Sequence, residues 1–314
     1  MKFIVLLAAI APPLFLLAYG IGKARADWRS EAIWNAFLVG AVGALGALAI
    51  ELALSYALPL NRAGPVAEAG FNAVLIAAIP EEAVKFFVLL YLAEKHVDVR
   101  RLQDLLVLAL AVSLGFATLE NFGYVISAGG WRTIAAWRAV TAVPGHGIDG
   151  LAMGALLIRA RLSGRAADVR LALIVPVILH ALYDFPLLAL RHGSDGAMMW
   201  FGVLWLVTVA ASSVFVITLC NRMLVKAVAF DFASGRDEGS KQSANWLIAG
   251  GVIGLIVGPL LAAWTLHTKG IEVAPVAAAL SIFPFAFGID AIRSGLKYRR
   301  SRLAAGRRSL DYAH

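Results

Sequence analysis

The sequence predicts an all-α, polytopic transmembrane helical bundle with about nine transmembrane helices. Apolar residues make up 61% of the 314 residues, and the mean hydropathy is +0.79, whereas soluble domains contain about 45–50% apolar residues. Apolar runs of helical length alternate with short polar loops. A membrane β-barrel would instead show segments of about ten residues with alternating hydrophobicity.

Nine apolar segments have the length of a membrane-crossing helix. Their approximate ranges are 3–22, 33–58, 71–93, 104–126, 139–158, 171–190, 198–221, 245–266 and 273–291. The first resembles the charged start and apolar core of a signal peptide. Its apolar run is long for a signal peptide, and Pro12 and Pro13 interrupt it. We therefore expect it to remain as a helix.

The polar stretch after the seventh span divides the chain into parts. We expect a transmembrane core at 1–230, a cytoplasmic linker at 231–245, a C-terminal transmembrane hairpin at 246–292 and a basic cytoplasmic tail at 293–314. The net charge of +8 could suggest nucleic acid. Because the basic residues lie in loops and in the tail, we expect anionic lipid as the partner of the tail and no nucleic acid.

The loop charges predict the orientation. Most of the 28 lysines and arginines follow the first, third, fifth and seventh spans or lie in the tail. By the positive-inside rule, the N-terminus lies outside and the C-terminus lies in the cytoplasm. The single cysteine, Cys220, excludes an intramolecular disulfide and a multi-cysteine metal site. Gly150 and Gly154 form a G-x-x-x-G pattern, which predicts a close approach of two helices.

The third span carries the motif Ile79-Pro80-Glu81-Glu82-Ala83-Val84-Lys85. A charged side chain at mid-membrane costs about 2.5–3.5 kcal/mol on insertion scales. On a helix, Lys85 lies within reach of both Glu81, at i and i+4, and Glu82, at i and i+3. One carboxylate can pair with Lys85 while the other is left for chemistry or for a metal. A purely structural ion pair is the alternative.

The next three spans, within the predicted catalytic region at about 71–190, carry further polar residues at helical spacing. These are Glu120 and Asn121 after Phe116, His146 and Asp149 before Gly150, and His180 with Asp184. Pairs at i and i+4 share one helix face. The alternating directions of the spans place all these groups in the outer half of the membrane, so we expect one interior site.

The residue types restrict the chemistry. The sequence has no G-x-S-x-G and no H-E-x-x-H motif. A glutamate can activate water as a general base, while histidines and an asparagine amide support the oxyanion. Alternatively, His146 and His180 with Glu81 or Glu120 can hold one divalent metal such as zinc. The residues leave both possibilities open, so we expect either no cofactor or one metal ion.

The four motifs, in their order, resemble those of the PrsW intramembrane protease family, which is related to the CAAX prenyl endopeptidase and bacteriocin-processing superfamily. The resemblance covers roughly residues 70 to 190. It implies a multi-pass protease of the bacterial inner (cytoplasmic) membrane that acts in regulated proteolysis. Its substrate is expected to be a membrane-tethered protein, such as an anti-sigma factor cut on the extracytoplasmic side.

The resemblance also implies roles. The candidate catalytic residues are Glu81, Glu82, Glu120, His146 and His180, and the candidate supporting residues are Lys85, Asn121, Asp149 and Asp184. By analogy, Glu81 is the base and Glu82 pairs with Lys85, in a glutamic or a metal-dependent endopeptidase. The related endopeptidases have His in place of Glu120 and Asn in place of Asp184. These acids make oxyanion donation less favourable and metal binding, or a protonated acid, more plausible.

A different function class is a proton- or ion-coupled transporter that uses the same buried carboxylates and histidines. Against it, the cluster is confined to four consecutive spans, and the chain shows no matching second half with interrupted helices. A non-catalytic scaffold or sensor is a third possibility. Cleavage of a membrane-tethered peptide would distinguish the protease from both.

Overall fold

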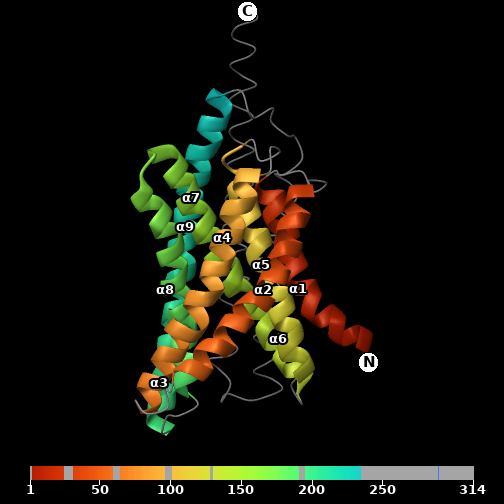
Figure 1. The fold of residues 1–314 in the computed structure, drawn as a ribbon, viewed down its shortest axis with the longest axis vertical. Helices are drawn as coiled ribbons and strands as arrows, with labels where there is room; N and C mark the ends of the chain where they lie inside the picture. Colours follow the sequence, from red (N-terminus) through yellow and green to blue (C-terminus); the bar gives the residue numbers. More distant parts are fainter. Residues whose placement is uncertain are drawn as a thin grey trace, which may run out of the picture. The chain divides into compact units, whose positions relative to one another are not determined.

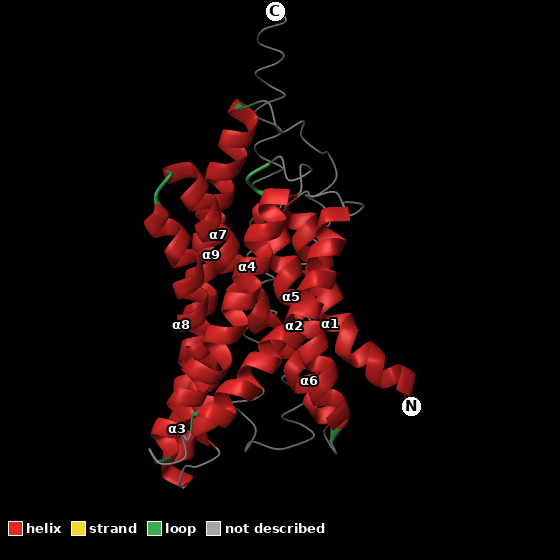
Figure 2. Cartoon of the chain, in the orientation of Figure 1, coloured by secondary structure: helices red, strands yellow, loops and turns green. Residues whose placement is uncertain are grey.

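The computed structural model of the chain describes residues 2–24, 31–58, 64–95, 101–127, 130–190 and 195–234, together with Ile289. Within these ranges every regular element is a helix and none is a strand (Figure 2). The chain divides into two compact units, of which the first comprises Met1–Gly20 and Ala26–Glu238 and is described below. The predicted hairpin, apart from Ile289, the basic tail and most of the linker lie outside the described residues.

Among the described residues, five helices contain stretches long and apolar enough to cross a membrane. They are α1 (Lys2–Ala24), α2 (Glu31–Ala57), α5 (Asp104–Ser127), α8 (Ala166–Leu190) and α9 (Asp195–Ala233). Large apolar side chains are exposed along α2, α8 and α9, as expected for surfaces that face lipid. The all-helical prediction is thus confirmed for the described residues. The count of nine spans and the orientation remain predictions.

The predicted third span is a longer helical path than expected, made of α3 (Pro65–Phe71), the π-helical segment η2 (Asn72–Ala78) and α4 (Ile79–Lys95). The backbone N–H of Ile79 donates to the carbonyl of Val74, five residues back. Pro80 has no N–H to continue the ladder, so the wider turn lies directly before the Glu81-Glu82 pair. Because a π-helical turn contains one extra residue, the helix faces before and after it are rotated relative to each other. This rotation was not predicted from the sequence.

The predicted fifth span, 139–158, corresponds to α7 (Ala142–Ser163), and a short helix, α6 (Trp131–Val140), precedes it and ends before Thr141. The sequence analysis did not expect α6. Its Trp137 stacks on Trp205 of α9, with ring centroids 5.5 Å apart and an interplanar angle of 26°. This stacking fixes α6 beside the bundle at the end where α5 finishes and α7 begins.

Helix α5 lies inside the bundle and packs against α2, α4, α6 and α7 (Figure 1). Every residue from Leu105 to Ala117 is buried. The four helices with the polar motifs are neighbours in a closed ring, because α4 packs on α5, α5 on α7, α7 on α8 and α8 on α4. This ring encloses the polar side chains.

Small residues allow α5 and α7 to approach closely. A Cβ atom added at Gly150 would lie 2.8 Å from the carbonyl oxygen of Ala109, and one at Gly154 would lie 2.9 Å from that of Leu105. Real Cβ atoms do not come so close, so only glycine fits at these two positions. The predicted G-x-x-x-G contact is confirmed.

Candidate active site

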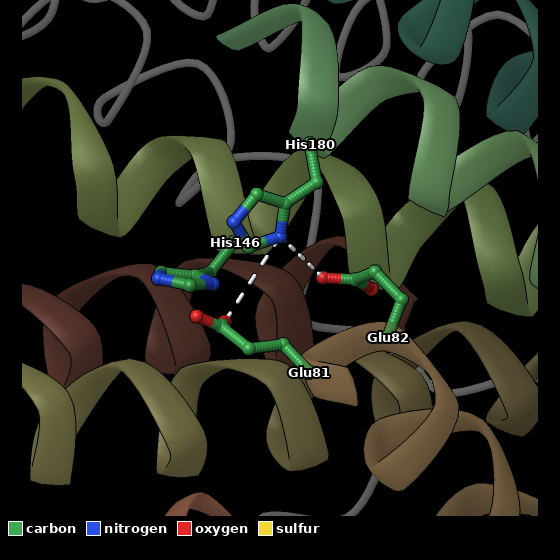
Figure 3. A group of neighbouring side chains, drawn as sticks. All are labelled: Glu81, Glu82, His146 and His180. Atoms are coloured by element: carbon green, nitrogen blue, oxygen red, sulfur yellow. Dashed lines mark hydrogen bonds and ion pairs between the residues drawn. The ribbon is translucent and has the colours of Figure 1, made fainter. Parts of the chain in front are cut away.

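Four predicted site residues lie together in the ring. One ligand atom from each of Glu81, Glu82, His146 and His180 lies within 4.8 Å of the other three, and all four residues are buried. Figure 3 shows the two glutamates rising from one helix toward the two imidazoles. The π-helical turn and Pro80 precede the glutamates directly, so this part of the helix determines the direction in which they point.

Lys85 joins this cluster, one helical turn after the glutamates. Its Nζ lies 2.7 Å from Glu82 Oε1, 3.2 Å from Glu81 Oε2 and 3.0 Å from His146 Nδ1. It also lies 4.2 Å from the ring centre of Phe116. The side chain is fully buried. Lys85 therefore pairs with both glutamates, with the shorter contact to Glu82.

The two glutamates are held differently. Oε1 of Glu82 accepts from Lys85 and, at 2.8 Å, from His180 Nδ1. Its Oε2 is buried without a hydrogen-bond partner among the described residues. Glu81 has a longer contact to Lys85 and lies 4.0 Å from His180 Nδ1. Glu81 is 6% exposed and Glu82 is 0% exposed, so Glu81 is the more loosely held and more accessible of the two.

On one side, His146 connects the cluster to α5 and α6. Its Nε2 lies 2.6 Å from Glu120 Oε2, and the same oxygen lies 3.0 Å from a terminal nitrogen of Arg138. Nε of Arg138 donates to Oδ1 of Asn121 at 2.6 Å. The Arg138 guanidinium also lies over the ring of Tyr124. Asn121, which was predicted to support the site, thus joins it through Arg138.

On the other side, His180 connects the cluster to carboxylates of α7 and α8. Its Nε2 lies 3.3 Å from Asp184 Oδ2, and its Nδ1 lies 3.9 Å from Asp149 Oδ2. Asp184 therefore forms the predicted i, i+4 pair with His180 on α8. Asp149 lies near His180 at a distance too long for a hydrogen bond.

The contacts define which ring nitrogens donate. An ammonium only donates, so Nδ1 of His146 accepts from Lys85, and Nε2–H donates to Glu120. Both partners of His180 are carboxylates, which only accept when ionised. With both ionised, His180 donates from both nitrogens and is positively charged. The two imidazoles therefore have opposite roles at the centre of the cluster.

Arg138 and Glu51 were not among the predicted site residues. Arg138 directly precedes the predicted fifth span, and the structure places it on α6 with a terminal nitrogen 3.0 Å from Glu120 Oε2. Glu51 lies on α2, which packs against α4 and α5, the helices that carry Glu81 and Glu120. The sequence feature that could have identified Glu51 is its position as a lone carboxylate within an apolar span, because such residues are rare without a functional or pairing role.

The metal alternative can be tested against these contacts. Both histidines direct Nδ1 into the cluster and hold Nε2 against a carboxylate, which is the arrangement that orients imidazole ligands in metal sites. However, Nζ of Lys85 already contacts three of the four possible donors. The lone pair of His146 Nδ1 cannot serve the ammonium and a metal together. With Lys85 in this position, the four residues do not fit a metal ion.

Comparison with known proteins places the chain in a family. Residues 29–218 match the model of the PrsW family intramembrane metalloprotease. Protease PrsW of Bacillus subtilis (strain 168) is 32% identical over 207 residues, covering 65% of this chain and 91% of the relative. Protease PrsW of Halalkalibacterium halodurans is 33% identical over 213 residues, covering 66% of this chain and 94% of the relative.

No solved structure matches the chain. The matched residues, 29–218, extend beyond the region of roughly 70 to 190 that carries the motifs, and they contain the whole polar cluster. The apolar spans, the buried Glu/His cluster and the curated relatives all indicate an intramembrane protease of this family. The chain therefore belongs to the PrsW family of intramembrane proteases.

Proposed function

We propose that this protein cleaves a peptide bond of a membrane-tethered protein with a water molecule activated by Glu81. The main supporting observation is the unequal environment of the two adjacent glutamates. Glu82 is fixed by Lys85 and His180 and is 0% exposed, whereas Glu81 has a longer contact to Lys85 and is 6% exposed. A general base must reach both the water and the substrate, and this favours Glu81.

The remaining groups then have complementary roles. Glu81 takes a proton from water, and the resulting hydroxide attacks the carbonyl carbon of the peptide bond. The negative charge on the carbonyl oxygen is stabilised by the positive charges of Lys85 and His180, which lie beside Glu81. When the carbon–nitrogen bond breaks, the proton held by Glu81 passes to the leaving nitrogen. His146, oriented by Glu120, keeps Lys85 in position.

Access to the site favours one direction. The side chains of Glu120 and Asp184 are 22% and 25% exposed, whereas Glu82 and Lys85 are fully buried. Both histidines thus end at a partly exposed carboxylate, and we infer that water and the substrate backbone approach the cluster past Glu120 and Asp184. A membrane-tethered anti-sigma factor is the substrate class that the family resemblance suggests.

The substitution Glu81→Gln, which replaces the carboxylate by an amide of the same size, tests the mechanism. Loss of a general base reduces the rate by about 10²–10⁴-fold, so the variant should be folded and nearly inactive. The assay compares new N-termini in membrane proteins of cells that express wild-type protein or the variant. Glu94→Gln is the matched control, because Glu94 is exposed on the same helix. If Glu82→Gln is inactive and folded while Glu81→Gln cleaves normally, the assignment is reversed.

The finer topology is part of the same proposal. We propose nine transmembrane helices in the inner membrane, with the N-terminus outside. After α9 follow a cytoplasmic linker, a transmembrane hairpin and a cytoplasmic tail that binds lipid. The cluster lies toward the bundle end where α5 finishes and α7 begins, which this orientation makes the outer half of the membrane.

A fluorescent protein that matures only in the cytoplasm tests this topology. Fused after Ser234 or after His314, it should fluoresce in both cases, because a hairpin returns the chain to the same side. Two dark fusions would mean the opposite orientation. A fluorescent fusion at Ser234 with a dark one at His314 would exclude the hairpin.

A further inference from the structure

We propose that the Lys85 ammonium is the resident cation of this cluster and excludes divalent metal ions from it. The proposal disagrees with the family's description as metalloproteases, and it rests on side-chain contacts in this chain. It goes beyond the proposed function because it concerns which cation the cluster holds. Metal binding can be measured without any cleavage assay, so either proposal can fail while the other holds.

Lys85 has a full set of hydrogen-bond acceptors for an ammonium. An ammonium has three N–H donors. Nζ of Lys85 has three acceptors at hydrogen-bond distance, namely Glu82 Oε1 at 2.7 Å, His146 Nδ1 at 3.0 Å and Glu81 Oε2 at 3.2 Å. The ring face of Phe116 lies 4.2 Å away and adds a cation–π contact. The charge is therefore balanced within the protein.

A metal ion would need the same oxygen and nitrogen atoms that Nζ of Lys85 contacts. Zinc binds imidazole nitrogen and carboxylate oxygen at about 2.0–2.2 Å. An ion at that distance from Glu81, Glu82 and His146 would occupy the place of Nζ. Two cations cannot share these lone pairs, and their repulsion would be strong in a buried site.

Lys85 has little freedom to move out of the cluster. It is among the largest fully buried side chains of the described residues. It also follows the two glutamates by three and four residues on the same helix, so its backbone cannot move away while they stay in place. The ammonium therefore belongs to the resting arrangement of the cluster.

These contacts predict the effect of removing the ammonium. Lys85→Ala vacates the position of Nζ and leaves the inward lone pair of His146 Nδ1, whose Nε2 is still held by Glu120. His180 and both glutamates remain beside the vacated position. Two imidazoles and a carboxylate are a common zinc ligand set. The variant should therefore gain a metal site that the wild-type protein lacks.

The test is metal content after equilibration of the full-length purified protein with Co²⁺ or Zn²⁺ and removal of free metal. Lys85→Ala should retain about one ion per chain and show visible Co²⁺ absorption, with at least about tenfold less metal on the wild type. The double variant Lys85→Ala/His146→Ala should lose the ion. Zinc should also raise the unfolding temperature of Lys85→Ala and leave that of the wild type unchanged.

Two outcomes would overturn the proposal. One is a wild-type protein that holds about one ion per chain in a manner that depends on His146. The other is a folded Lys85→Ala protein that binds no more metal than the wild type. If Lys85→Ala does not fold, the wild-type measurement still decides, because stoichiometric Co²⁺ bound at His146 contradicts a resident ammonium and its absence supports one.

Discussion

His146 and His180 have the same pattern of contacts, but different groups face them at the centre of the site. Each imidazole directs Nε2 to an outer carboxylate, Glu120 or Asp184, and Nδ1 inward. Nδ1 of His146 meets the Lys85 ammonium, whereas Nδ1 of His180 meets the carboxylate of Glu82. Identical residue types on neighbouring helices therefore accept in one case and donate in the other, and the neighbour determines which.

The largest effect on stability should come from deleting the donating imidazole. His180→Ala leaves the fully buried carboxylate of Glu82 with Lys85 as its one hydrogen-bond donor among the described residues, and breaking a buried charge pair costs about 3–5 kcal/mol. His146→Ala leaves Lys85 one acceptor short, which costs about 1–3 kcal/mol. The free energy of unfolding of each variant in detergent micelles measures the difference.

Equal losses for the two variants would contradict the opposite roles of the imidazoles. A larger loss for His146→Ala would mean that the positive charge lies on His146. Glu94→Gln again serves as the control for a change on the exposed surface, because the side chain is exposed on α4.

A smaller effect is expected on the outer part of the His146 side, where Arg138 contacts Glu120 and Asn121. Arg138→Met keeps most of the side-chain length and removes the ion pair and the hydrogen bond to Asn121. Hydrogen bonds to charged groups contribute about 1.5–3 kcal/mol, so the free energy of unfolding should fall by about that amount. The matched control is Arg132→Met, at the other end of α6, where the guanidinium lies 5.2 Å from the Trp131 ring.

Cleavage rates would show whether Arg138 acts on the site through Glu120. If Glu120 orients His146 and depends on Arg138, Arg138→Met should lower the cleavage rate and Arg132→Met should not. If both variants cleave at the wild-type rate, Arg138 fastens α6 to α5 without influencing the chemistry.

The comparison also shows what the sequence could predict. Glu81, Glu82 and Lys85 were predicted to interact because i, i+3 and i, i+4 spacing brings side chains together on any helix. His180 and Asp184 follow the same rule on α8. The glycines between α5 and α7 were also predictable, because two small residues four apart leave a groove on one helix face.

Contacts between helices were less predictable. Arg138 reaches Glu120 and Asn121 because α6 folds back beside α5, and no residue spacing encodes that return. The arginine therefore resembled an ordinary loop cation. The π-helical turn before Glu81 was not predicted either. Pro80 shows that the backbone hydrogen bonds are interrupted at this point, but a kink, a helix end and a wider turn are all compatible with a proline. Periodicity predicted faces of single helices, and packing decided which faces meet.

The smallest effect should come from the outer carboxylate on the His180 side. Asp184 contacts Nε2 of His180 at 3.3 Å, and its side chain is 25% exposed. In Asp184→Asn, the amide oxygen still accepts from Nε2–H, and solvent-side exposure limits the cost of losing the charge. We expect the free energy of unfolding to fall by about 0.5–1 kcal/mol, well below the loss in His180→Ala. A loss as large as that of His180→Ala would show that the charge of Asp184, rather than Glu82, is what holds the imidazole. The two histidine sides would then differ in their outer partners and not at the centre of the site.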